Sequence, residues 1–159
     1  MVNIADDVSR ALGEIIGKPC TRVEVGNFNS LSLGFGEPTR PTAKHDQKDY
    51  RDWEIGTYRS AWRVVKQGLI LCGSRDAVES VQELNAALRQ IQLGRFSSLS
   101  QPTELDVRID FDSGIAIDFL AATGDNDESF HIFCPGAVCV EFVVHRGWKI
   151  GPSDKPWGM

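Results

Sequence analysis

The chain has 159 residues, of which 42% are hydrophobic and 25% charged, an ordinary balance for a globular protein with one core. No apolar run approaches the roughly 20 residues of a membrane span, and the first ten residues lack a signal-peptide stretch, so we expect a cytoplasmic protein. The formal net charge of -5 argues against nucleic acid or an anionic membrane as partner and favours a basic one, although mild acidity also serves solubility alone.

Two segments recur at a distance close to half the chain length. Ile16-Gly17-Lys18 is answered 77 residues later by Leu93-Gly94-Arg95, and residues 64–74 are answered 79 residues later by residues 143–153. Internal repetition is a stronger guide to architecture than local propensity. The sequence therefore predicts a single domain over residues 1–159, made of two pseudo-repeats at about 1–75 and 76–159.

The chain is expected to begin with a helix and a hairpin. Apolar residues at helical spacing predict a helix over Asn3–Ile16, which Gly17 can end. Thr21–Val25 and Leu31–Phe35 then have strand composition, and residues 26–29 between them have the composition of a hairpin turn.

A polar, proline-bearing segment, residues 37–52, is expected to be a long surface loop, and such loops are often functional. Strands are predicted after it at 53–57, 61–66 and 69–72. A second helix is predicted to open at Ser74 or Asp76, with a capping-box glutamate at position 79. Its apolar stripe comprises Val78, Val81, Leu84, Leu88 and Ile91.

The second half repeats the plan. Leu105–Phe111 alternates apolar and polar residues and continues through a turn at 112–114 into a return strand at 115–119. A short acidic loop at 125–128 precedes closing strands at 130–133, 137–144 and 148–150. The predicted fold is α+β, an antiparallel β-sheet with two helices, each half being a helix plus a β-meander. Polar residues would line one face of the sheet, and the helices would cover the other.

No known catalytic signature accompanies this scaffold. The sequence lacks a Gly-x-Ser-x-Gly motif, a Walker phosphate loop and a His-Glu-x-x-His zinc motif. The four cysteines do not have zinc-site spacing and are expected to be free thiols, and Cys72 is interpreted as structural rather than nucleophilic. We therefore expect a protein that is not an enzyme and holds no metal or cofactor.

Two acidic clusters are the candidate partner-binding sites. Charged patches of this kind steer basic partners, and Tyr and Trp anchor interfaces well. The same residues can equally be solvated surface, and the aromatic ones can belong to the core. The candidates are Asp46, Asp49, Tyr50, Asp52, Trp53 and Glu54 in the first cluster, and Asp125, Asp127 and Glu128 in the second.

Four segments together give the chain a resemblance to the immunity proteins of bacterial polymorphic-toxin and contact-dependent growth-inhibition systems. They are Trp62-Arg63-Val64, residues 72–76, residues 110–114 and residues 147–151. The resemblance implies a role without catalytic residues, which is to bind a cognate toxin, often a basic nuclease, and block its active site. The alternatives are a small enzyme or ligand-binding protein with a pocket between the two repeats, and a homodimeric scaffold.

Overall fold

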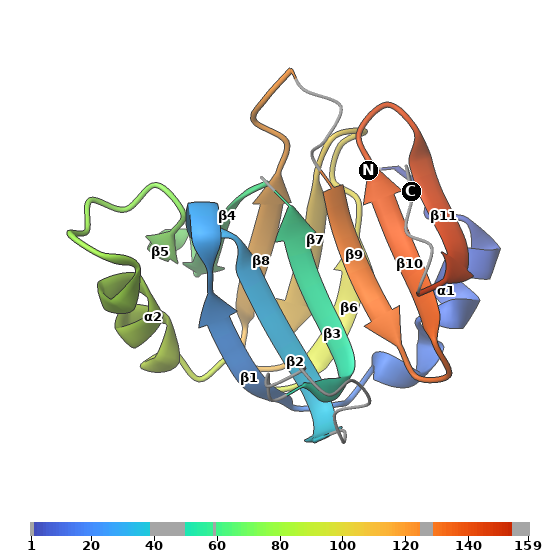
Figure 1. Cartoon of the computed structure of the whole chain (residues 1–159), viewed down its shortest axis with the longest axis horizontal. Helices are drawn as coiled ribbons and strands as arrows, with labels where there is room; N and C mark the ends of the chain where they lie inside the picture. The colour runs from blue at the N-terminus through green and yellow to red at the C-terminus, as the bar shows by residue number, and fades with distance from the viewer. Residues whose placement is uncertain (1, 39–49, 59, 125–128, 154–159) are drawn as a thin grey trace.

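The computed structural model describes residues 2–38, 50–58, 60–124 and 129–153 (Figure 1). Two antiparallel sheets form two layers, and the two helices lie at opposite sides of them. This confirms the predicted α+β class with antiparallel sheet and two helices. The prediction that the helices cover one face of the sheet is wrong. The inner face of each sheet packs against the other sheet, and the helices contact strands at the sheet edges.

The front layer in Figure 1 is a six-stranded sheet with the order β1-β2-β3-β9-β10-β11. Its strands are β1 (Cys20–Val25), β2 (Leu31–Pro38), β3 (Arg51–Tyr58), β9 (Ser129–Cys134), β10 (Val138–Val143) and β11 (Gly147–Pro152). The central pair, β3 and β9, joins segments that are far apart in the sequence.

The second layer is a five-stranded sheet with the order β5-β4-β8-β7-β6. Its strands are β4 (Ala61–Lys66), β5 (Leu69–Gly73), β6 (Phe96–Ser100), β7 (Val107–Phe111) and β8 (Ile115–Leu120). The predicted strand over residues 61–66 has the observed bounds, whereas β6 was not predicted at all.

Both helices are shorter than predicted. The first is α1 (Asp6–Ala11), followed by a short 3-10 turn, η1 (Gly13–Ile15), because Gly13 is a poor helix former. The second is α2 (Val81–Arg89), which begins several residues after Asp76. Ser80 caps it, since its Oγ accepts a hydrogen bond from the Glu83 backbone N–H at 3.3 Å.

Aromatic side chains from both sheets meet in the core between the layers. Phe35 of β2 contacts Phe96 of β6 and Phe111 of β7, with ring centroids 5.7 and 6.1 Å apart. Phe119 of β8 contacts Phe130 of β9 at 4.9 Å. These contacts fix the two layers against each other and leave the outward faces for polar side chains. No helix in the described part of the chain has the length and apolarity needed to cross a membrane.

Candidate functional site

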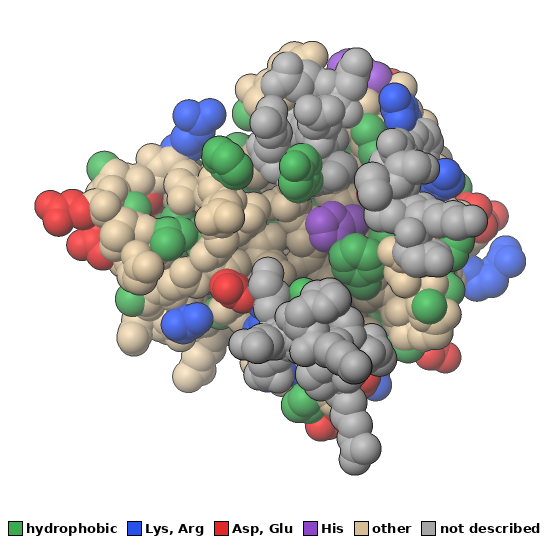
Figure 2. Space-filling model, in the orientation of Figure 1, with side chains coloured by type: hydrophobic (Ala, Val, Ile, Leu, Met, Phe, Trp, Pro, Cys, Tyr) green, Lys and Arg blue, Asp and Glu red, His purple; other side chains and the backbone are tan. Residues whose placement is uncertain are grey.

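The outward face of the six-stranded sheet carries two rows of aligned side chains, set by strand register. One row runs through Arg22, Gly34, Glu54, Phe133 and Cys139, and the next runs through Glu24, Ser32, Gly56, His131, Glu141 and Lys149. In Figure 2, which looks onto this face, the described charged side chains stand mostly at its margins.

Arg22 is the centre of a network of ionic hydrogen bonds on this face. Its guanidinium lies 3.2 Å from a carboxylate oxygen of Glu54, also pairs with Glu24, and donates to the Ser32 hydroxyl at 3.2 Å. The side chains of Arg22 and Glu54 are only 11% and 9% exposed. The positive charge of Arg22 is thus paired with carboxylates of the same sheet.

Glu54 is held in place from two sides. Besides the Arg22 pair, its carboxylate accepts a hydrogen bond from the Arg51 backbone N–H at 3.0 Å. Burial nevertheless raises the pKa of Glu54 above its ordinary value, because desolvation outweighs the stabilisation by these donors. Glu54 is therefore part of the scaffold of this surface rather than a free carboxylate.

His131 lies against the backbone of β3. It stands opposite Gly56 in the β3–β9 register, and its ring contacts Phe133 with centroids 4.9 Å apart. Burial lowers the pKa of His131 to about 4, so the ring is neutral at physiological pH. On the other side, Glu141 of β10 is its cross-strand neighbour.

Two carboxylate side chains are exposed to solvent at the end of this sheet where β2 ends and β3 begins. Asp52 and Glu37 are both exposed, and one Asp52 oxygen accepts a hydrogen bond from the Glu37 backbone N–H at 3.3 Å. Tyr50 is half-buried, with the Arg22 guanidinium 5.8 Å from its ring centroid, a cation–π contact. We call Glu37, Tyr50 and Asp52 the acidic rim.

The candidate residues predicted from the sequence have different locations. Tyr50 and Asp52 lie at the acidic rim, and Glu54 is buried directly behind it. Trp53 is 4% exposed and belongs to the core, because it points to the inward face of β3. It therefore presents no surface to a partner in this structure. Five candidates lie outside the described residues: Asp46, Asp49, Asp125, Asp127 and Glu128.

Sequence reasoning did not identify Arg22, Glu24, His131 or Glu141 as members of this face. Their alternation along each strand is visible in the sequence and could have placed them outward. What brings them together is the pairing of β3 with β9, which no local pattern specifies.

The outward face of the five-stranded sheet holds a second ionic cluster. Asp118 of β8 accepts hydrogen bonds from Arg63 Nε at 2.9 Å and from Arg108 Nε at 2.6 Å. Burial alone would raise the pKa of Asp118, but the two arginines outweigh it, and the pKa lies below its ordinary value. A pocket of about 460 Å³ lies over this cluster, lined also by Asp106 and Asp110.

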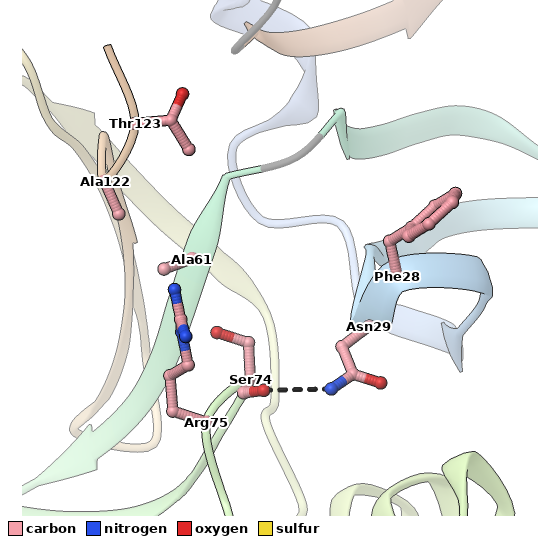
Figure 3. Close-up of a pocket in the computed structure, with 7 residues that line it drawn as sticks. All are labelled: Phe28, Asn29, Ala61, Ser74, Arg75, Ala122 and Thr123. Carbon is pink, nitrogen blue, oxygen red and sulfur yellow. Dashed lines mark hydrogen bonds between the residues drawn. The ribbon is translucent and has the colours of Figure 1, made fainter. Parts of the chain in front are cut away.

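A smaller pocket of about 310 Å³ is drawn in Figure 3. Residues from distant parts of the chain line it, and Asn29 Nδ2 donates to the backbone oxygen of Ser74 at 3.0 Å beside it. The lining residues are Phe28, Asn29, Ala61, Ser74, Arg75, Ala122 and Thr123.

The four cysteines are free thiols, as expected. Burial raises the pKa of Cys20 and Cys139 to about 12 and that of Cys72 and Cys134 to about 11. Each is therefore protonated and weakly nucleophilic at neutral pH. Among the residues that the structure describes, no three His, Cys, Asp or Glu side chains gather in a way that could hold a metal ion.

Comparison of the chain with protein-family models, curated proteins and solved structures found no match.

Proposed function

We propose that this protein is a non-enzymatic, cytoplasmic immunity protein of a contact-dependent growth-inhibition or related polymorphic-toxin system. It would bind a cognate toxin domain, a basic nuclease, and occlude its active site. The single observation that carries the proposal is the acidic rim, where Glu37 and Asp52 are exposed near Tyr50 at one end of the six-stranded sheet.

The electrostatics of the rim favour a basic partner. Two described arginines lie near this end of the sheet: Arg22 is engaged by Glu24 and Glu54, and Arg51, opposite Pro38, donates from Nε to the Thr21 hydroxyl at 3.0 Å. Nucleases hold phosphate groups with lysine and arginine side chains. Carboxylates placed opposite those side chains would compete with the nucleic acid and steer the encounter.

Tyr50 is suited to anchor such a contact. Its ring is held against Arg22, so little conformational freedom would be lost when a partner covers the rest of it. Aromatic residues pre-positioned in this way often dominate binding energy at interfaces.

Co-expression with the protein encoded immediately upstream of this gene tests the function as a whole. We expect the neighbour to arrest growth alone, and this chain to restore growth and copurify with it. A neighbour that is harmless and does not copurify would contradict the immunity function.

The binding surface is tested separately by charge reversal. The Glu37→Lys/Asp52→Lys variant should weaken toxin binding by tenfold or more at low salt and by less at high salt, because salt screens exposed charges. The matched control is Glu79→Lys/Glu104→Lys, which makes the same change in net charge at exposed residues outside the rim. Equal affinities of the two variants would exclude the acidic rim as the interface.

We also propose that the chain is built from two pseudo-repeats. In the six-stranded sheet, β1-β2-β3 from the first half of the chain adjoin β9-β10 from the second half. In the five-stranded sheet, β6-β7-β8 from the second half adjoin β4-β5 from the first half in the corresponding order, which supports the proposal. Residues 17–20 and 94–96 also pair antiparallel with each other, and Glu54 and Asp118 hold matching positions on β3 and β8. In this correspondence the β4–β5 hairpin matches the β9–β10 hairpin. The 79-residue spacing between residues 64–74 and 143–153 would instead match it with the next hairpin, β10–β11.

A ligand-binding role is the second candidate, favoured by the pocket in Figure 3. Its lining combines Ala61, Ser74 and Arg75 from the first half of the chain with Ala122 and Thr123 from the second. A small molecule bound there would raise the melting temperature, because it would stabilise only the native state. A thermal-shift screen with the wild type and an Arg75→Ala variant would identify such a ligand.

A further inference from the structure

The pocket over the Arg63–Asp118–Arg108 cluster has a floor of aligned polar side chains. Arg63 of β4 and Arg108 of β7 stand opposite Asp118 of β8 on either side, and Ser100 of β6 continues the row beside Arg108. Asp110 lies two residues after Arg108 on the same face of β7, with its Cα about 7 Å away. The strand register therefore gathers these side chains around one hollow of about 460 Å³.

The loop between β6 and β7 closes one end of this pocket. Asp106 fixes the loop, because one of its carboxylate oxygens accepts a hydrogen bond from the Thr103 hydroxyl at 2.9 Å and the other accepts from the Ala121 backbone N–H at 3.1 Å. Pro102 and Leu120 add apolar surface at the same end. The volume lies within the range of about 300–1,000 Å³ that is usual for small-molecule sites. The hollow is thus formed in advance by strands and a pinned loop.

The two arginines keep hydrogen-bonding capacity that the described part of the chain does not use. Arg63 donates to Asp118 from Nε alone, and Arg108 donates to it from Nε and Nη2. The side chains of Arg63 and Arg108 are 44% and 36% exposed. The remaining guanidinium N–H groups are therefore accessible from the pocket, and such groups form strong, charge-assisted hydrogen bonds to a carboxylate.

Asp110 is the carboxylate in this pocket with spare capacity. Both oxygens of Asp118 already accept hydrogen bonds from the arginines, and both oxygens of Asp106 hold the loop. Among the described residues, Asp110 makes no side-chain hydrogen bond or ion pair, and it acts on Arg108 through its charge alone. An ammonium group placed beside Asp110 would supply the missing donor.

The charge of the lining distinguishes between classes of ligand. Two arginines and three aspartates line the pocket, which gives a formal balance of -1. A ligand with only an anionic group would be opposed by that balance. A ligand with only a cationic group would leave the guanidinium N–H groups, which cannot accept hydrogen bonds, without an acceptor. A ligand that carries both groups close together satisfies Arg63, Arg108 and Asp110 at once.

We propose that this pocket binds a free α-amino acid with an apolar side chain. The ligand's carboxylate accepts hydrogen bonds from Arg63 and Arg108, its ammonium group donates to Asp110, and its side chain contacts Pro102 and Leu120. In an α-amino acid a single carbon separates the carboxylate from the ammonium group, which matches the neighbouring positions of Arg108 and Asp110 on β7. The acidic rim lies on the other sheet, so the site goes beyond the proposed toxin binding and does not depend on it.

Isothermal titration calorimetry with L-leucine and L-phenylalanine tests the chemistry of the ligand. We expect the wild-type protein to bind these amino acids. Isocaproate, which is leucine without its ammonium group, and isopentylamine, which is leucine without its carboxylate, should each bind at least tenfold more weakly than L-leucine, because each lacks one charged hydrogen-bonding group. L-glutamate should also bind more weakly, because its second carboxylate adds negative charge to an already acidic lining.

Two substitutions test the location of the site. Arg63→Gln and Asp110→Asn each remove one charged partner, and each should weaken L-leucine binding by tenfold or more. The matched controls are Arg75→Gln, at an exposed arginine of the pocket in Figure 3, and Asp76→Asn, at an exposed aspartate, and both should keep the wild-type affinity. Circular dichroism shows that each variant is folded. Asp110→Asn removes no hydrogen bond within the described residues, so it tests the site even if Arg63→Gln is unstable.

The proposal would be overturned if neither L-leucine nor L-phenylalanine bound at millimolar concentration, or if isocaproate bound as tightly as L-leucine. A loss of affinity in Arg75→Gln instead of Arg63→Gln would place the ligand in the pocket of Figure 3 and would overturn it as well. None of these readouts involves the toxin, so their failure leaves the proposed function untouched. Charge reversal at the acidic rim should in turn leave L-leucine binding unchanged.

Discussion

Nε2 of His131 lies 2.6 Å from the position that a Cβ atom would occupy on Gly56. The two residues face each other in the β3–β9 register, so the imidazole fills the space that a side chain on β3 would take. A similar relationship holds at Gly34, where a Cβ would lie 2.7 Å from Cγ of Arg51 and 3.0 Å from Cβ of Arg22. Glycine on this face allows large side chains from neighbouring strands to lie flat against the sheet.

The first prediction concerns Gly56→Ala. In a strand with ordinary φ, replacing glycine by alanine stabilises by about 0.4–1 kcal/mol. Here we expect a loss of about 1–3 kcal/mol in the free energy of unfolding, because the new methyl group overlaps the His131 ring. The urea midpoint measures this. Gly151→Ala is the matched control in β11, since its Cβ would meet nothing within 4 Å. In the His131→Ala background the cost of Gly56→Ala should largely disappear, and a full cost there would refute the explanation.

The second prediction concerns pH. His131 has a pKa of about 4 in the folded protein, below the ordinary 6.5. The unfolded chain therefore binds this proton first, so the contribution of His131 to stability is complete above pH 6.5 and is lost as the pH falls towards 4. The slope is at most about 1.4 kcal/mol per pH unit. Wild type and His131→Gln should show diverging stabilities across this window, and parallel pH curves would contradict the prediction.

The third prediction concerns the Arg63–Asp118–Arg108 cluster. Asp118→Ala leaves two arginines side by side without their carboxylate, and we expect a loss of about 2–3 kcal/mol, below that of a fully buried pair because both guanidinium groups are partly exposed. Arg63→Ala should cost about 1 kcal/mol, since Arg108 still makes two hydrogen bonds to Asp118. Chemical denaturation of the two single variants measures both, and equal losses would show that the arginines do not share the carboxylate.

Secondary structure was largely predictable where hydrophobic alternation is clear, and the candidate site much less so. The predicted strand 61–66 is confirmed as β4, in which the buried Trp62 and Val64 lie on either side of the polar Arg63. Residues 96–100 contain three serines and gave no strand signal, yet they form β6 because they pair with β7. Trp53 was placed at the interface although its alternation with Glu54 and Ile55 already indicates the inward face. Arg22 and Glu54 meet through the consecutive strands β1, β2 and β3, whereas His131 joins them through the pairing of β3 with the distant β9, which no local pattern specifies.

The last prediction concerns Phe28, which is 91% exposed in the turn η2 (Asn27–Asn29) between β1 and β2. Its φ of 58° lies in the left-handed region, which costs a bulky residue about 1–2 kcal/mol and which asparagine tolerates better. Since little buried area is lost, Phe28→Asn should raise the free energy of unfolding by about 0.5–1 kcal/mol. Asn29 should not be exchanged in the same experiment, because its side chain and backbone tie the turn to Ser74 and Trp62. Thermal and urea unfolding measure the effect. A stabilised Phe28→Asn variant would show that the left-handed backbone at Phe28 costs stability in the wild type. A destabilised variant would contradict the prediction and show that the aromatic ring supports the fold.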